Sequence, residues 1–108
     1  MKQETAMQNL IKITLSKNGC IVHRANVGTF YTPDGRMIHI GIDGHSDLYG
    51  HRPDGKAFYI EVKTKTGKVS FKQAAFLSAM KNSGAIAGVV RSPKEALALV
   101  FPEAVDDK

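Results

Sequence analysis

An aspartate and a Glu-x-Lys pair stand on two neighbouring β-prone segments of the sequence. Asp47 lies in "HSDLYG", and Glu61 and Lys63 lie in "YIEVKTKTG". Side chains of a strand alternate between two faces, so Glu61 and Lys63 share a face with Tyr59. One interpretation is a charged stripe in contact with solvent. However, the Pro-Asp-Gly turn in "HRPDG" predicts a hairpin that brings Asp47 close to Glu61.

Two adjacent carboxylates repel each other unless a cation lies between them. Mg²⁺ suits such a place because it is a hard ion that takes oxygen ligands. A lysine beside the ion can orient or deprotonate an attacking water, and it offsets the charge of a phosphorane-like transition state. Asp47, Glu61 and Lys63 therefore form a minimal set for metal-assisted phosphodiester hydrolysis.

The composition is that of an ordinary globular protein, with 108 residues, 43% hydrophobic and 23% charged. The length predicts one domain over residues 1–108. The composition excludes the disordered and membrane classes. The formal net charge of +5 favours an anionic partner, with nucleic acid first. There is neither an apolar run of membrane-spanning length nor a signal-peptide pattern, and the lone Cys20 reads as a small core residue. We therefore expect a cytoplasmic protein.

Periodicity, turn residues and caps predict an α/β domain with a mixed β-sheet flanked by helices. The expected order is α-β-β-β-α-β-α. A helix over Lys2–Lys17 ends at Asn18-Gly19, and the strand "CIVHRAN" ends at Gly28. The remaining segments are a strand centred on Ser46–Tyr49, the strand "KAFYIEVKT", a helix over Ser70–Asn82, the buried strand "AIAGVV", a helix "SPKEALALVF" capped by Ser92 and begun by Pro93, and a frayed tail "PEAVDDK".

The ordered set of motifs resembles the VRR-NUC (virus-type replication-repair nuclease) domain of the PD-(D/E)xK nuclease superfamily. The resemblance rests on "HRANVG", "SDLYG", "YIEVKTKTG" and Gln73 in the following helix, and it extends from Glu4 to "GAIAGVVRSPKEAL". One departure is Ser46, which stands where the superfamily's name places proline.

The resemblance implies a restriction-endonuclease-like core and a role for each matching residue. Asp47 and Glu61 would be metal ligands, with the main-chain carbonyl of Val62 as a third. Lys63 would be the catalytic lysine. Gln73 would lie near the scissile phosphate or the attacking water, and Glu4 would complete the acidic cluster directly or through a water.

The resemblance also implies the activity, which is that of a Mg²⁺- or Mn²⁺-dependent endodeoxyribonuclease. Small standalone relatives resemble Holliday-junction resolvases that act as homodimers, so branched DNA, a second copy of the chain and a bacterial or phage-infected cell are expected. An alternative is a DNA-binding module without catalysis on the same fold. The apolar "EALALVF" is one candidate for a dimer interface.

Several of these residues have a simpler interpretation. Ser70 and Gln73 form an S-x-x-Q capping box, in which the glutamine reaches back to the cap. Glu4 suits the first turn of a helix through the macrodipole. Arg24 and Asn26 are either polar residues of an edge strand or contacts to the DNA backbone.

Other residues are candidates for binding DNA or a metal. We expect three lysines around the Glu-x-Lys strand to hold phosphates: Lys65, Lys68 and Lys72. The segment "FYTPDGR" is a candidate mobile loop whose Phe30 or Tyr31 meets the nucleic acid. His39, His45 and His51, with Asp43 and Asp47, could instead form a zinc site, although their spacing matches no zinc motif.

Overall fold

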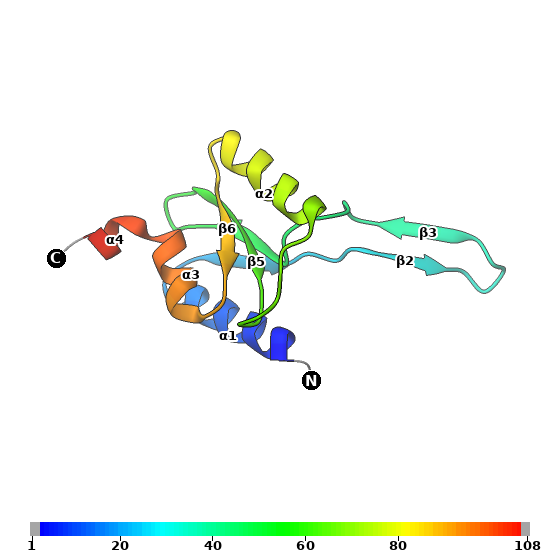
Figure 1. The fold of residues 1–108 in the computed structure, drawn as a ribbon, viewed down its shortest axis with the longest axis horizontal. Coiled ribbons are helices and arrows are strands. Elements are labelled where there is room, and N and C mark those ends of the chain that lie inside the picture. Colours follow the sequence, from blue (N-terminus) through cyan, green and yellow to red (C-terminus); the bar gives the residue numbers. More distant parts are fainter. Residues whose placement is uncertain (1–2, 107–108) are drawn as a thin grey trace.

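The computed structural model describes residues 3–106, which form helices around a β-sheet and a separate hairpin (Figure 1). The elements are α1 (Gln3–Lys17), β1 (Ile21–Arg24), β2 (Gly28–Tyr31), β3 (Met37–Ile40), β4 (Leu48–His51), β5 (Ala57–Val62), α2 (Phe71–Asn82), β6 (Ile86–Val90), α3 (Pro93–Val100) and α4 (Pro102–Asp106). None of the helices described is long and apolar enough to cross a membrane.

The main sheet has four strands in the order β1-β4-β5-β6. β4 pairs antiparallel with both β1 and β5, and β6 pairs parallel with β5. The parallel pair is connected through α2, which makes β5-α2-β6 a crossover unit. The sheet is therefore mixed, and the predicted α/β class is confirmed.

The helices cover both faces of the sheet (Figure 1). α1 and α3 pack on the face that carries Phe58, Ile60 and Val62, all three fully buried. α2 packs on the opposite face of β5 and β6, where Phe76 meets Tyr59 edge to face. Cys20 is buried in the core, as expected.

Local signals explain where α2 and α3 begin. Ser70 caps α2 in a complete capping box with Gln73, and Ser92 caps α3 with Pro93 in the first turn. Both starts agree with the prediction.

β4 begins at Leu48, later than the predicted strand centred on Ser46–Tyr49. Its backbone lies very close to β1: a Cβ added at Gly50 would lie 1.8 Å from the carbonyl oxygen of Ile21. Glycine is therefore required in "SDLYG" by this close approach of two backbones.

The expected element order is wrong between residues 25 and 40. β1 ends at Arg24, and Gly28 begins β2 instead of ending β1. The segment expected to be a mobile loop forms the β2–β3 hairpin, whose Pro33-Asp34-Gly35 turn is closed by a hydrogen bond from Thr32 N to Arg36 O. This hairpin belongs to no other sheet, so its strands face no core that would impose an apolar–polar alternation.

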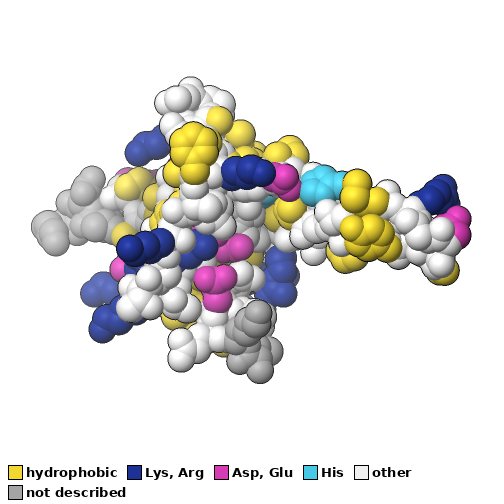
Figure 2. All heavy atoms as spheres, turned by 45° about the vertical axis from the view of Figure 1, so that its right-hand side comes forward, with side chains coloured by type: hydrophobic (Ala, Val, Ile, Leu, Met, Phe, Trp, Pro, Cys, Tyr) yellow, Lys and Arg dark blue, Asp and Glu magenta, His cyan; other side chains and the backbone are white. Residues whose placement is uncertain are grey.

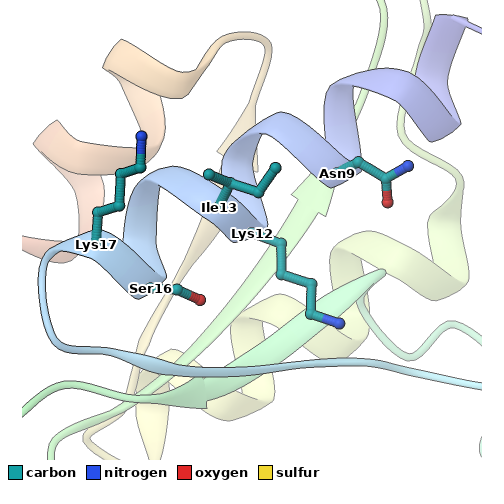
Figure 3. A pocket seen from close by; sticks show the side chains of 5 residues that line it. All are labelled: Asn9, Lys12, Ile13, Ser16 and Lys17. Carbon is teal, nitrogen blue, oxygen red and sulfur yellow. The ribbon is translucent and has the colours of Figure 1, made fainter.

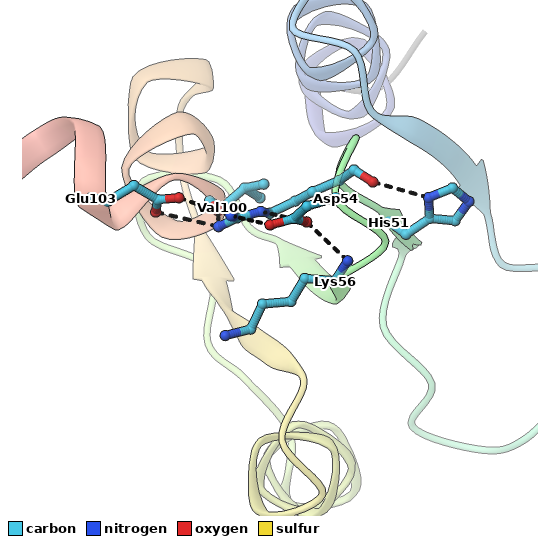
Figure 4. Close-up of polar contacts among 6 residues, drawn as sticks. His51, Asp54, Lys56, Val100 and Glu103 are labelled. Atoms are coloured by element: carbon cyan, nitrogen blue, oxygen red, sulfur yellow. Dashed lines mark hydrogen bonds and ion pairs between the residues drawn. The ribbon is translucent and has the colours of Figure 1, made fainter.

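Residues 102–106 of the expected frayed tail form α4 (Pro102–Asp106), which Arg52 holds to the β4–β5 turn (Figure 4), and residues 107–108 lie outside the described part of the chain. The Arg52 guanidinium donates to Asp54 Oδ2 at 2.6 Å and to the Val100 carbonyl at 2.9 Å. It also pairs with Glu103 at 2.8 Å and lies over the Phe101 ring. These contacts attach the last helix to the body.

Candidate active site

Glu61 is buried between β5 and the start of α2, with 1% of its surface exposed. Gln73 Nε2 donates to Glu61 Oε2 at 2.7 Å, and Lys63 Nζ lies 3.4 Å from the same oxygen. A solvated stripe is therefore the wrong interpretation for this part of the strand. Glu61 Oε1 is also buried, and it has no hydrogen-bond partner among the residues described.

Asp47 lies next to Glu61, at the point where β4 separates from β5. The pairing of β4 with β5 ends at Leu48 and Ile60. Beyond it, Asp47 Oδ2 accepts a hydrogen bond from the Val62 N–H at 2.8 Å, so the side chain replaces a backbone acceptor. A strand residue directs its N–H and C=O to the same side, which places the Val62 carbonyl on the side of Asp47 as well.

The electrostatics of Glu61 reflect this crowding. Burial raises the pKa of Glu61 to about 7, and the negative charge of Asp47 adds to the effect, while Lys63 opposes it. A raised pKa means that the ionised carboxylate lacks compensating charge in the free protein. Cation binding would supply that charge.

The amide of Gln73 is held at both ends. Its Oε1 accepts from the Ser70 N–H at 2.9 Å, and its own backbone N–H donates to Ser70 Oγ at 3.1 Å. With Oε1 fixed by the capping box, Nε2 points to Glu61. The structural and site interpretations of Gln73 therefore hold together.

Arg91 is a residue of this region that the sequence reasoning missed. It follows β6 directly, and its Nη1 donates to the carbonyl oxygens of Thr64 and Gly67. Its backbone N–H donates to Glu95 Oε1 at 2.8 Å. Arg91 thus fixes the loop after Lys63. The available signal was its position, since neighbouring parallel strands end at the same edge of a sheet.

Glu4 stands apart from this group. It lies half-buried in the first turn of α1 and makes no hydrogen bond or ion pair with the residues described. Within residues 3–106, no third His, Cys, Asp or Glu side chain joins Asp47 and Glu61 in a set that could hold a metal. The predicted role of Glu4 in the acidic cluster therefore needs a bridging water, and it stays a prediction.

The predicted DNA-binding residues lie on several different elements. Arg24 Nη2 donates to Asn9 Oδ1 on α1 at 2.7 Å. Asn26 lies exposed beyond the end of β1, so its predicted place in the strand "CIVHRAN" is wrong. Lys65 and Lys68 are exposed in the loop before α2. On the face shown in Figure 2, acidic side chains lie in the middle of the body with Lys and Arg side chains around them.

Lys72 and the histidines make contacts of their own. Lys72 pairs with Asp43 at 3.5 Å, and His39 pairs with the other oxygen of Asp43 at 3.2 Å. His45 and His51 each bond to a backbone carbonyl next to them in sequence. These residues do not form a zinc centre, since none of the residues described groups into such a set.

A separate pocket of about 630 Å³ runs along α1 (Figure 3). It is lined by Asn9, Lys12, Ile13, Ser16 and Lys17. None of the predicted site residues lines it, so it is a different surface from the acidic pair.

A mixed sheet that carries Asp and Glu-x-Lys at the same end of two adjacent strands, with a glutamine on the next helix, has the arrangement of a PD-(D/E)xK nuclease core. The family model of the VRR-NUC domain matches residues 2–94, so the chain belongs to the VRR-NUC family. A solved structure described as a VRR_NUC domain shares the fold, with a TM-score of 0.68 and 24% sequence identity over 93% of this chain and 96% of that chain. No curated protein gave a significant match. Family membership implies a nuclease-type function with DNA as the substrate class.

Proposed function

We propose that the chain is a Mg²⁺- or Mn²⁺-dependent endodeoxyribonuclease that cleaves branched DNA as a homodimer. The observation that carries the proposal is the buried Glu61 carboxylate beside Asp47, with one oxygen that no described residue satisfies. A buried acceptor without a donor is costly, and two neighbouring carboxylates repel each other. Both features fit a divalent cation.

Asp47, Glu61 and the Val62 carbonyl are the groups that would hold the ion. All three are oxygen donors, as Mg²⁺ prefers, and three protein oxygens would leave the other positions of its octahedral shell to water. When bound, the ion would supply Lewis-acid stabilisation of the charge that develops on the phosphate.

Lys63 and Gln73 act through Glu61. As an ammonium paired with Glu61, Lys63 offers donors to the attacking water and to the oxygens of the phosphate. Gln73 holds one oxygen of Glu61, which leaves the other to face the cation. Water forms the new bond to phosphorus and releases a proton, the P–O bond to the sugar breaks, and the leaving sugar oxygen takes up a proton.

Branched DNA and the homodimer are the finer parts of the proposal. Symmetric cleavage of a four-way junction requires two active sites, and one chain has one Asp47–Glu61–Lys63 set. Two copies related by a two-fold axis would present two such sets.

The test is cleavage of a labelled four-way junction, beside plain duplex and single strand, with Mg²⁺ or Mn²⁺. Wild type is compared with Lys63→Ala and Asp47→Ala. We expect paired nicks in the junction that both variants lose by a factor of about a thousand or more. Equal cleavage of all three substrates would remove the selectivity for branched DNA. Tight binding without cleavage under either ion would favour the binding module instead.

A further inference from the structure

The β2–β3 hairpin projects from the body as an arm, defined here as residues 27–42 (Figure 1). Its two strands pair only with each other, and none of the strands of the main sheet extends them. The arm lies along the longest dimension of the molecule, which measures 59 Å against 32 and 26 Å for the other two. Most of its surface therefore has no protein beside it.

The arm is unusually apolar for an exposed element (Figure 2). Among the large hydrophobic side chains that the structure describes as exposed, seven of eleven belong to residues 27–42. Tyr31 is 71% exposed and Met37 is 66% exposed. A concentration of this kind on a soluble protein marks a surface that another molecule covers.

The pairing register divides these side chains between two faces. Gly28 stands opposite Ile40, and Phe30 stands opposite Ile38, so these four residues share one face. This face, which we call the Phe30 face, carries no polar side chain. The Phe30 ring lies across Gly28, within 3.2 Å of where a Cβ would stand. The other face is mixed, with a hydrogen bond between Thr29 and His39 beside the Tyr31–Met37 pair.

The charge of the arm distinguishes protein from nucleic acid as the partner. The chain carries a net charge of +5, yet the arm contains only Asp34 and Arg36 as permanently charged groups, and these pair with each other at 3.4 Å. Binding of nucleic acid depends on positive groups that neutralise phosphates, for single strands as well as duplexes. A neutral apolar face suits a protein surface.

We propose that the arm is the homodimer interface, with the Phe30 face packed against a second copy of this chain. This inference deepens the proposed function, since it names the surface through which the two active sites are joined. An isolated two-stranded hairpin is marginal in water, so its partner should be present whenever the chain folds. A second copy satisfies that condition.

The symmetry of a dimer agrees with this surface. In an isologous interface each arm contributes the same patch, so Phe30, Ile38 and Ile40 of the Phe30 face would pack against the same three side chains of the second copy. Together these six side chains would form an apolar centre of the kind that interfaces have inside a polar rim. The segment "EALALVF" of α3 fits less well as the interface, because Ala96 and Val100 are buried and Leu97, Leu99 and Phe101 pack on the chain's own core.

The test compares Ile38→Asp with Ile13→Asp in sedimentation velocity across the micromolar range. Ile38 is 45% exposed on the arm, and Ile13 is 52% exposed beside the α1 pocket, so the same change is made at two similar exposures. We expect wild type and Ile13→Asp to sediment as dimers and Ile38→Asp as a monomer. Circular dichroism should show an unchanged helical signal in both variants.

Hydrogen exchange of the unmodified chain provides a second measurement. We expect the amides of residues 28–40 to exchange more slowly as the protein concentration rises, since dimerisation covers them. A wild-type monomer at all concentrations would overturn the proposal, and so would dissociation by Ile13→Asp alone. Loss of DNA binding by Ile38→Asp without any change of oligomeric state would assign the arm to DNA instead.

The junction assay keeps this proposal separate from the proposed nuclease activity. A monomer that nicks DNA would overturn the arm interface and leave the nuclease in place. A dimer that loses its association on Ile38→Asp but cleaves no substrate would support the arm and overturn the proposed activity.

Discussion

Glu61 combines three influences that rarely meet on one carboxylate: full burial, an adjacent Asp47 and an ion pair with Lys63. In the free protein the first two outweigh the third, so the pKa rises. The neutral form therefore stabilises the fold, while the ionised form is the one that binds a cation. Stability without metal and affinity for metal should change in opposite directions with pH.

The first prediction concerns the stability of the metal-free protein. A group whose pKa is about 7 in the folded state and 4.5 when unfolded contributes stability that is complete below pH 4.5 and lost as the pH rises to about 7. For Glu61 the loss is on the order of 2–3 kcal/mol. Glu61→Gln removes this titration. We therefore expect urea unfolding in EDTA to show wild type falling relative to Glu61→Gln between these pH values.

The comparison with the variant is necessary because other carboxylates contribute the opposite slope. Arg52 lowers the pKa of Asp54, so that pair gains stability as the pH rises. Both proteins share it, and it cancels in the difference. Parallel pH profiles for wild type and Glu61→Gln would show that Glu61 is not held in the protonated form.

At the scale of elements, α2 connects the fold to the site. Its capping box closes the helix and at the same time aims Gln73 Nε2 at Glu61. On the other side, Arg91 after β6 holds the loop that begins at Thr64. Two elements that flank β5 thus determine how its charged residues are presented.

The second prediction separates the two functions of this cap. Ser70→Ala removes the hydroxyl acceptor but retains Gln73, whereas Gln73→Ala removes the contact with Glu61 too. Each should lower the free energy of unfolding by about 1 kcal/mol. Only Gln73→Ala should reduce cleavage, by about ten- to a hundredfold, and raise the Mg²⁺ concentration for half-maximal rate. Equal losses of activity in both variants would assign Gln73 a purely structural role.

Which elements the sequence predicts depends on how local their causes are. The starts of α2 and α3 and the β4–β5 turn follow from Ser70, Ser92 and "HRPDG", whose partners lie within a few residues. α4 depends on a contact between Arg52 and Glu103, 51 residues apart, which no local pattern reveals. The arm escapes prediction because its apolar runs face no core of their own chain.

The contacts of the site likewise differ in whether local sequence patterns predict them. The proximity of Asp47 to Glu61 can be predicted, because "HRPDG" predicts the β4–β5 hairpin that brings the two residues together. The Gln73–Glu61 and Arg91–Gly67 contacts depend on how α2 and β6 pack on β5, so spacing alone does not give them.

At the scale of the whole molecule, charge and apolar surface lie on different parts. The arm is neutral and apolar, while the excess of positive charge belongs to the body. The contacts of Asp43 with His39 and Lys72 connect the arm to the start of α2, where Gln73 is located. In a dimer joined by its arms, the two bodies would remain free to present their basic surfaces to two strands of DNA.

The third prediction tests whether the basic surface is localised around the site. Lys65 and Lys68 are exposed in the loop that follows Lys63, whereas Lys12 and Lys17 line the α1 pocket. The double variants Lys65→Ala/Lys68→Ala and Lys12→Ala/Lys17→Ala each remove two positive charges, so they change the overall field equally. Neutralising a phosphate releases counterions, and each lost contact lowers the slope of log K against log salt by about 1.

We therefore expect Lys65→Ala/Lys68→Ala to reduce the slope by about 2 and Lys12→Ala/Lys17→Ala to leave it unchanged. The measurement is fluorescence anisotropy of a labelled junction in Ca²⁺, which occupies oxygen sites and is used here so that cleavage does not deplete the DNA. Equal slopes for the two variants would mean that the net charge attracts DNA without a defined contact surface. A larger effect of Lys12→Ala/Lys17→Ala would place the DNA along α1, away from Glu61. That result would contradict the assignment of the acidic pair as the cleavage site.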